Sequence, residues 1–391
     1  MSMNHLNLMN MQQAIDYLGV SRSTIDRWRK EKNLPFVKIG KEVLIDKKYL
    51  DSWIRSFLYE QQENAIVQIG YQSGTAHMWT GLLMKEMGFF EEELQLTFQN
   101  NKWKVNWYNA SSGLELVELM IKGKIHIASL GDYPMTICQE LSQILPNFSS
   151  VILAFDGKTE NGKGISLVTS KENKINSIED LSYAPISTVT NSSAEVRLPY
   201  YLTSLSAEFH PEIVHKKMNE SMESINQRCI SASVMWEPYP SLMNYYGTGR
   251  IMKNEVKVSD YLTGIVSENS WLLKNEGVAI SYLKAHIRSH QLMRNNLDKA
   301  ARILATATNI PVEVVTRVVS KVRWDSCIYD RDINTLKNFR SNIRKPQSNY
   351  VSHNSKFLIK MEYLQTAIDE LNLPLLQSSL IRGEWKKELI Y

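Results

Sequence analysis

Two short amphipathic segments separated by a glycine open the chain. Residues 9–19 carry apolar side chains at helical spacing, and Gly19 is suited to the left-handed conformation that ends a helix. Ser21 is placed to cap a second helix over residues 22–30. This order predicts a helix-turn-helix whose second helix offers a basic face to the major groove of DNA.

A strand pair and a third helix follow. Residues 36–39 and 42–45 alternate in polarity around Gly40-Lys41, which predicts a β-hairpin, or wing, with a basic tip. Asp46 is placed to cap a last helix over residues 47–57.

Three sequence runs carry a resemblance to a known family: L-G-V-S-R-S-T-I-D-R-W at 18–28, L-P-x-x-x-I-G at 34–40 and I-x-x-x-x-L-x-x-W-I at 45–54. This stretch resembles the excisionase-type winged helix-turn-helix family, which is related to MerR-like domains. The resemblance implies a DNA-binding domain over residues 1–60 with double-stranded DNA as its partner. The alternative is a small protein-interaction domain whose lysines are merely solvated.

The positive charge of the chain is concentrated in the same stretch. Residues 1–60 hold ten Lys or Arg and seven Asp or Glu, whereas the remaining residues are nearly balanced within a total of +4. Side chains of the second helix would read bases, while lysines there and in the wing would bind phosphates. The domain reads few base pairs, so we expect a homodimer on paired half-sites. The expected DNA-binding residues are Arg22, Ser23, Thr24, Arg27, Lys30, Lys38 and Lys41.

From residue 65 onward, strand patterns alternate with helix patterns. This alternation predicts an α/β fold with a largely parallel sheet, in which ligands bind beyond the carboxyl ends of the strands. The expected strands are 65–71, 105–108, 125–130, 150–155, 165–169 and 184–188, with a loop over 156–163. Residues 232–239 are expected as a strand that runs into a helix. The expected helices include 76–87, 113–122, one from Met135, and peripheral helices at 298–308, 311–321 and 323–324. Residues 346–391 contain two further helical patterns.

Five motifs in register resemble the type II periplasmic binding-protein fold: I-G-Y-Q-S-G at 69–74, A-S-L-G-D-Y-P at 128–134, S-I-E-D-L at 177–181, N-S-S-A at 191–194 and V-M-W-E-P-Y at 234–239. They are similar to the aliphatic-sulfonate, taurine and nitrate solute-binding group with its thiamine-precursor relatives. The resemblance implies a ligand-sensing domain over 61–391 with two lobes around a cleft. Lobe 1 would span about 65–156 and 262–391, and lobe 2 about 157–250.

Polar residues at strand ends are the candidates for the cleft. Two rows of hydroxyl and amide groups precede helices, where backbone N–H groups can seat an anion; plain helix capping explains the serines equally well. The expected ligand-binding residues are Gln72, Ser73, Thr75, Asp132, Tyr133, Asn191, Ser192, Ser193, Glu195, Trp236 and Glu237.

The chemistry of the ligand follows from a departure from the family pattern. The family often has a histidine where this chain has Glu195. With Asp132 and Glu237, this carboxylate disfavours a simple anion and suggests a ligand bearing an amine or a protonated heterocycle. The expected ligand classes are a sulfonate, a taurine-like zwitterion or an aminopyrimidine. Alternatively, Glu195 pairs with Arg197 or lies on the helix surface.

The two resemblances together predict a one-component transcriptional regulator that senses a small molecule. The start of the chain does not resemble a secretory signal, three separated cysteines fit a reducing cytosol, and no apolar run approaches the roughly 18 residues of a membrane span. We therefore expect a cytoplasmic protein without a membrane partner.

Two other functions stay open. One is an excisionase-like architectural DNA-binding protein whose large domain is a partner-binding platform. The other is an enzyme of the same fold related to thiamine-pyrimidine synthesis; we expect no catalysis, because no nucleotide-binding or nucleophile motif occurs. His286 and His290 lie four residues apart on one expected helix and could bind a metal, but Lys284 and Arg288 flank them and no third ligand is evident. We expect a solvated helix face there, with neither metal nor cofactor.

Overall fold

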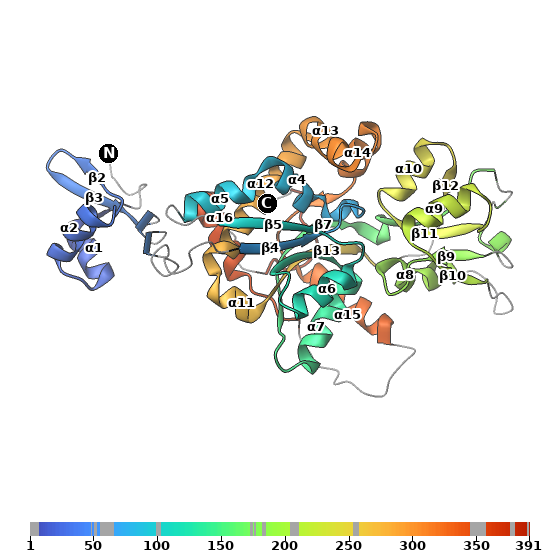
Figure 1. The fold of residues 1–391 in the computed structure, drawn as a ribbon, viewed down its shortest axis with the longest axis horizontal. Helices are drawn as coiled ribbons and strands as arrows, with labels where there is room; N and C mark the ends of the chain where they lie inside the picture. Colours follow the sequence, from blue (N-terminus) through green and yellow to red (C-terminus); the bar gives the residue numbers. More distant parts are fainter. Residues whose placement is uncertain are drawn as a thin grey trace. The chain divides into compact units, whose positions relative to one another are not determined.

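The computed structural model of the chain describes residues 8–47, 49–50, 53–54, 66–98, 103–172, 175, 177–181, 185–203, 211–252, 258–344, 357–375, 380–388 and 391. The chain forms two compact units (Figure 1). The first contains residues 1–66 with 91–104, and the second contains 67–90 with 105–391, so that the boundary falls inside helix α5 (Phe89–Thr97).

The first unit is a winged helix-turn-helix. Its elements are β1 (Leu8–Asn10), α1 (Met11–Leu18), α2 (Arg22–Glu31), β2 (Val37–Ile39) and β3 (Glu42–Asp46). The expected turn is confirmed, because Gly19 ends α1 in the left-handed conformation with a φ of 62°. Ser21 Oγ accepts a hydrogen bond from the Thr24 backbone N–H at 3.2 Å and so caps α2.

Strand β1 is the element of this unit that the hydrophobic pattern did not predict. It pairs with β3 in a three-stranded antiparallel sheet of order β1-β3-β2, so the wing is wider than a hairpin. Asn10 ends this strand and also begins α1, where its side chain and that of Gln13 form a capping box.

A small core holds the first unit together. Helix, sheet and third-helix residues meet there, and the Trp28 and Trp53 rings pack 5.4 Å apart on one side of it. Of the expected third helix, residues 47, 49–50 and 53–54 are described and are helical; the rest lies outside the described residues. The buried members of the core are Ala14, Ile25, Leu34, Ile45 and Leu50.

The second unit contains two mixed sheets. The first has the order β14-β7-β13-β6-β4-β5, and its strands are β4 (Ile66–Tyr71), β5 (Lys104–Asn109), β6 (Ile127–Gly131), β7 (Ser150–Thr159), β13 (Tyr261–Glu268) and β14 (Arg323–Trp324). The second has the order β10-β9-β11-β8-β12, and its strands are β8 (Ile165–Ser170), β9 (Ile186–Thr188), β10 (Ile213–His215), β11 (Ala232–Trp236) and β12 (Gly249–Ile251). We call the part built on the first sheet the first lobe and the part built on the second sheet the second lobe.

Helices surround the sheet of each lobe (Figure 1). The first lobe has η1 (Ala76–Met78), α4 (Trp79–Met87), α6 (Gly113–Ile121), α7 (Asp132–Ile144), α11 (Asn269–Lys274), α12 (Glu276–Asn295), α13 (Leu297–Thr308), α14 (Val312–Val319), α15 (Asp330–Arg344) and α16 (Glu362–Glu370). The second lobe has η3 (Glu179–Leu181), α8 (Ser193–Tyr201), α9 (Met218–Asn226) and α10 (Tyr239–Tyr245). The chain passes from the first lobe to the second after β7, through the short helix η2 (Glu160–Gly162), and returns between β12 and β13.

Two expectations about elements were wrong, and one helix was not anticipated. The expected loop over 156–163 begins as strand, because β7 continues through Thr159. Its polar residues are buried with partners: Lys158 forms an ion pair with Asp332 at 2.7 Å. Residues 323–324 form β14 rather than a helix, and α15 was not anticipated.

The expectation of a solvated helix face at His286 and His290 was also wrong. Both side chains are fully buried, because α12 packs against α4, α13 and α16 and against strand β14. Lys284 and Arg288, whose charges suggested an exposed helix face, have partners within the protein. Arg288 stacks on Phe89 at 4.4 Å, and Lys284 lies 3.4 Å from Glu370. Among the described residues, no helix has both the length and the apolar character needed to cross a membrane.

His126 makes the stability of the second unit depend on pH. Its Nδ1 accepts a hydrogen bond from the Gln68 backbone N–H at 3.1 Å, and its ring stacks on Trp271. Burial lowers the pKa of His126 to about 4. In the unfolded chain His126 titrates near pH 6.5. Between pH 6.5 and about 4 the unfolded chain therefore binds more protons at this residue than the folded chain does. The free energy of unfolding falls as the pH is lowered through this range.

We therefore predict that His126→Asn, which keeps an acceptor but does not titrate, flattens the acid limb of the stability curve. Thermal unfolding followed between pH 7 and pH 4 should show a steeper loss of Tm in the wild type than in the variant. The other titrating groups are common to both chains and cancel in the comparison. Parallel curves would contradict the lowered pKa of His126.

Candidate functional site

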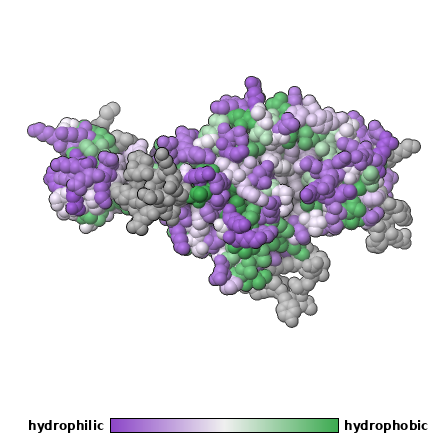
Figure 2. All heavy atoms as spheres, in the orientation of Figure 1, coloured by the Kyte–Doolittle hydropathy of each residue, from purple (hydrophilic) through white to green (hydrophobic). Residues whose placement is uncertain are grey.

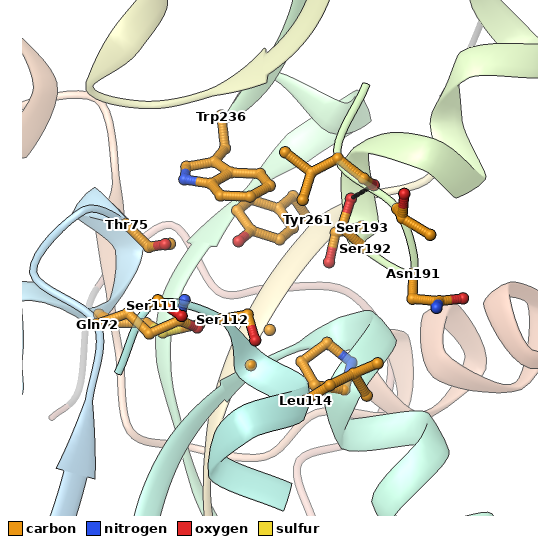
Figure 3. Close-up of a pocket in the computed structure, with 16 residues that line it drawn as sticks. Gln72, Thr75, Ser111, Ser112, Leu114, Asn191, Ser192, Ser193, Trp236 and Tyr261 are labelled. Atoms are coloured by element: carbon orange, nitrogen blue, oxygen red, sulfur yellow. Dashed lines mark hydrogen bonds between the residues drawn. The ribbon is translucent and has the colours of Figure 1, made fainter. Parts of the chain in front are cut away.

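A cleft lies between the two lobes of the second unit (Figure 3). Loops that follow strands β4, β5 and β6 form one wall, and the loop between β9 and α8 faces them with Trp236. Its volume, counted as the space open to the centre of a water molecule, is about 50 Å³. Its lining residues are Gln72, Thr75, Met78, Ser111, Ser112, Gly113, Leu114, Gly131, Pro134, Val189, Thr190, Asn191, Ser192, Ser193, Trp236 and Tyr261.

Three helices begin at the cleft. Ser112 caps α6 by accepting a hydrogen bond from the Glu115 N–H at 3.2 Å, and Ser192 caps α8 by accepting from Ala194 N–H at the same distance. Helix α7 begins after Gly131, whose backbone is a further part of the wall. The positive ends of three helix dipoles therefore meet at this cleft, which favours an anion.

None of the lining residues carries a formal charge. The polar lining consists of hydroxyl and amide groups, which serve as hydrogen-bond donors to an anion without a counter-charge. Thr75 is the clearest donor, because it stands before η1 and its side chain makes no capping hydrogen bond. An anion here would be held by dipoles and neutral donors, as in other helix-terminus anion sites.

Trp236 and Tyr261 supply the aromatic part of the lining (Figure 3). The Trp236 indole N–H donates to the Gly74 carbonyl oxygen at 2.9 Å, which fixes the ring across the two lobes. Tyr261 is buried, and burial raises the pKa of its hydroxyl far above the ordinary value, so the ring stays neutral. Together these rings offer an apolar contact to the non-ionic part of a ligand.

The structure places six of the eleven expected ligand-binding residues in the lining: Gln72, Thr75, Asn191, Ser192, Ser193 and Trp236. The other five lie beside the cleft and make internal contacts. Ser73 is held by Asn109, whose Nδ2 donates to its Oγ at 2.8 Å. The Tyr133 hydroxyl donates to Asn191 Oδ1 at 3.2 Å and thus joins the lobes.

Asp132 forms a buried ion pair with Arg197 that also joins the lobes. Asp132 stands at the start of α7 and Arg197 lies on α8; Oδ2 and NH2 are 2.6 Å apart, and both side chains are fully buried. The same guanidinium nitrogen donates to the Asp260 carbonyl oxygen at 2.7 Å, next to the returning strand β13. The pair therefore fixes one lobe against the other directly behind the cleft.

The two remaining carboxylates also point elsewhere. Glu195 accepts a hydrogen bond from the Asn191 backbone N–H at 2.6 Å and lies 3.7 Å from His215, rather than pairing with Arg197. Glu237 accepts a hydrogen bond from the Ser241 hydroxyl at 3.0 Å, and burial raises its pKa. With Asp132 neutralised by Arg197, no carboxylate lines the described cleft, and the reason for expecting an amine on the ligand disappears.

Sequence reasoning missed the third polar row of the cleft, at Ser111 and Ser112. Glu115 holds Ser111 in place, since its Oε2 accepts hydrogen bonds from both the backbone N–H and the hydroxyl at 2.8 Å. This row follows an expected strand and precedes an expected helix, as the two recognised rows do. The rule that polar residues between a strand and a helix are candidates for the cleft would therefore have predicted Ser111 and Ser112 as well. Tyr261 carries no such signal, because it comes from a returning strand far along the chain.

The expected DNA-binding residues lie on the first unit, where hydrophilic side chains cover much of the visible face (Figure 2). Ser23, Arg27 and Lys30 are exposed along one side of α2, with Arg22 also exposed and Thr24 partly exposed. Lys38 and Lys41 are exposed in the wing.

A further arginine of the same helix is structural. Arg29 forms an ion pair with Asp26 at 2.8 Å and stacks on Phe36 at 4.1 Å, so it ties α2 to the wing. It is therefore a poor candidate for reading DNA.

Comparisons with known proteins match these two units separately. A family described as a helix-turn-helix domain matches residues 8–57. A Bacillus subtilis protein named for binding aliphatic sulfonates is 22% identical over 269 residues, which are 68% of this chain and 77% of the relative.

Solved structures match the second unit. The alkanesulfonate-binding protein SsuA from Xanthomonas axonopodis bound to MOPS superposes with a TM-score of 0.58 at 16% identity, covering 73% of this chain and 96% of that one. The periplasmic nitrate-binding protein NrtA from Synechocystis gives 0.59 at 13% identity, covering 81% and 92%. The chain thus consists of an N-terminal helix-turn-helix domain followed by the two-lobed fold of the type II periplasmic binding proteins.

Proposed function

We propose that this protein is a ligand-responsive DNA-binding regulator: its helix-turn-helix domain binds duplex DNA, and its cleft senses a small sulfonate-class anion. One observation carries the proposal. An uncharged cleft at three helix N-termini occurs in the same chain as a helix-turn-helix domain. Since DNA is the partner of such a domain, the proposed place of action is the cytoplasm.

The chemistry of the lining supports a sulfonate over a cationic ligand. A tetrahedral anion with three oxygens can accept several hydrogen bonds at once from Thr75, Ser112 and backbone N–H groups at the helix starts. The aromatic rings would contact the organic part of the ligand. The names of the relatives, which include binders of aliphatic sulfonates, support the same class.

The basic side of α2 and the wing supports the DNA half of the proposal. Arg27 and its neighbours on α2 would reach base edges in the major groove, while Lys38 and Lys41 would bind the phosphate backbone. One copy of a domain this small reads a short site, so two copies on paired half-sites are proposed.

Ligand and DNA must then be coupled. Closure of the lobes on the ligand would change the placement of two DNA-binding domains within a dimer, provided that the ligand binds one arrangement better than the other. Typical coupling free energies of roughly 1–3 kcal/mol would change DNA affinity about 5–150-fold.

The test begins with a duplex obtained by in vitro selection on the full chain. Fluorescence anisotropy should show that a saturating alkanesulfonate changes the Kd for this duplex by at least about fivefold, within the usual coupling range. If an alkanesulfonate binds the protein and the duplex affinity stays the same, the cleft is no sensor for DNA binding.

The second prediction concerns the cleft alone. Thr75→Val keeps the shape of the side chain and removes its donor, so alkanesulfonate affinity measured by calorimetry should fall roughly 10–150-fold, the effect of a hydrogen bond to a charged group. Ser73→Ala is the matched control, because that hydroxyl is turned to Asn109. Equal affinities in the two variants would remove Thr75 from the site.

The third prediction concerns the DNA-binding face. Arg27→Ala should weaken binding to the selected duplex by about 1–3 kcal/mol and relax its sequence preference. Lys41→Ala should weaken all duplexes alike and reduce the salt slope by about one. Lys122→Ala, at an exposed lysine directly after α6, serves as the control and should change neither. Unaltered binding in the first two variants would reject this face.

A further inference from the structure

Asp156, His286 and His290 form a buried cluster in the first lobe, and none of the three lines the cleft. We call it the buried histidine cluster. All three side chains are fully buried, Asp156 on β7 and both histidines on α12. The Asp156 Oδ1 atom lies 3.3 Å from His290 Nε2 and 3.7 Å from His286 Nε2. One ligand atom from each residue can be chosen so that all three lie within 4.8 Å of one another.

Neighbouring hydroxyl groups form hydrogen bonds with the three side chains and hold them in place. Ser326 Oγ lies 3.1 Å from the Nδ1 atoms of both histidines. Thr80 donates to Asp156 Oδ1, and Ser129 donates to Asp156 Oδ2 at 2.9 Å. Both carboxylate oxygens therefore accept hydrogen bonds, as an ionised carboxylate does, and both imidazoles turn Nε2 toward it.

The protons on these groups cannot give every polar atom of the buried histidine cluster a hydrogen-bond partner. Ser326 has a single hydroxyl hydrogen, so it can donate to one Nδ1 at most and must accept from the other. A histidine that donates through Nδ1 has, when neutral, a bare lone pair on Nε2. At least one bare Nε2 therefore faces the Asp156 carboxylate, and His286 Nε2 is buried with no hydrogen-bond partner.

This arrangement also leaves a negative charge in the core. Among the described residues, no Lys or Arg forms an ion pair with Asp156; its basic neighbours are the two histidines. An unpaired buried carboxylate is costly, and a positive ion between the three atoms would offset that cost.

We propose that the buried histidine cluster binds one divalent transition-metal ion of the zinc type. Two imidazole nitrogens and one carboxylate oxygen are ligands typical of zinc, whereas calcium and magnesium prefer oxygen alone. Ligand atoms of a tetrahedral zinc ion lie roughly 3.3–3.5 Å apart, close to the observed separations. Ser326 has the place of the outer partner that orients metal-binding histidines.

The ion would be structural rather than catalytic. It lies in a fully buried site and would tie β7 to α12, just before β7 leaves the first lobe. Binding to the folded chain alone raises the stability of that chain.

The test uses the full chain without an affinity tag, after removal of metals by a chelator. Addition of Zn²⁺ should give roughly one tightly bound equivalent per chain by elemental analysis and raise Tm by several degrees. Substitution with Co²⁺ should produce the visible absorption bands of a tetrahedral ion with nitrogen ligands. X-ray absorption of the zinc form should show two imidazole ligands.

Variants assign the ion to this cluster. His290→Gln should lose the cobalt bands, whereas His215→Gln, a partly exposed histidine of the second lobe, should keep them. The wild-type spectra decide the matter even if the first variant fails to fold. A folded wild-type chain that shows no cobalt bands and no change of Tm with Zn²⁺ would overturn the proposal. The negative charge of Asp156 would then be balanced by an additional proton and not by a metal ion.

Discussion

The ion pair between Asp132 and Arg197 is the interaction on which the arrangement of the two lobes depends. It joins the start of α7 to α8 across the lobes, and both side chains are fully buried. Removal of one member of such a pair costs about 3–5 kcal/mol, because it leaves the other charge buried and unpaired. A movement that separates the start of α7 from α8 would break this pair. The pair also leaves the cleft with hydroxyl, amide and aromatic groups and the positive ends of three helices, a lining that suits the proposed anionic ligand.

Local patterns were sufficient for most of the fold. Gly19 and Ser21 set the turn and cap of the helix-turn-helix, and polar rows after strands marked the loops of the cleft. The errors arose where a residue's partner is distant in sequence. Lys158 has the polarity of a loop residue but pairs with Asp332, and His286 has charged neighbours but faces Asp156. The spacing of residues along the chain cannot show such contacts, because tertiary packing decides which polar side chain is buried.

Carboxylates explain why the cleft residues were predicted only in part. Asp132, Glu195 and Glu237 lie within a few residues of the lining. The one partner that the sequence suggested, Arg197 for Glu195, pairs with Asp132 instead. In the structure each carboxylate has a partner within the protein. Asp132 pairs with an arginine, Glu195 accepts a hydrogen bond from a backbone N–H, and Glu237 accepts one from a serine hydroxyl. An acidic residue beside a binding loop therefore indicates the charge of a ligand only after its internal partners are known.

In the proposed regulator, occupation of the cleft and binding of DNA are thermodynamically linked. Linkage is reciprocal, so DNA must change the affinity of the cleft by the same factor by which the ligand changes the affinity for DNA. Calorimetric titration of the full chain with an alkanesulfonate, alone and in complex with its selected duplex, measures this factor from the side of the cleft. We expect two different dissociation constants whose ratio equals the ratio measured from the DNA side. The same dissociation constant in both titrations would show that the cleft and the DNA-binding domain are not linked.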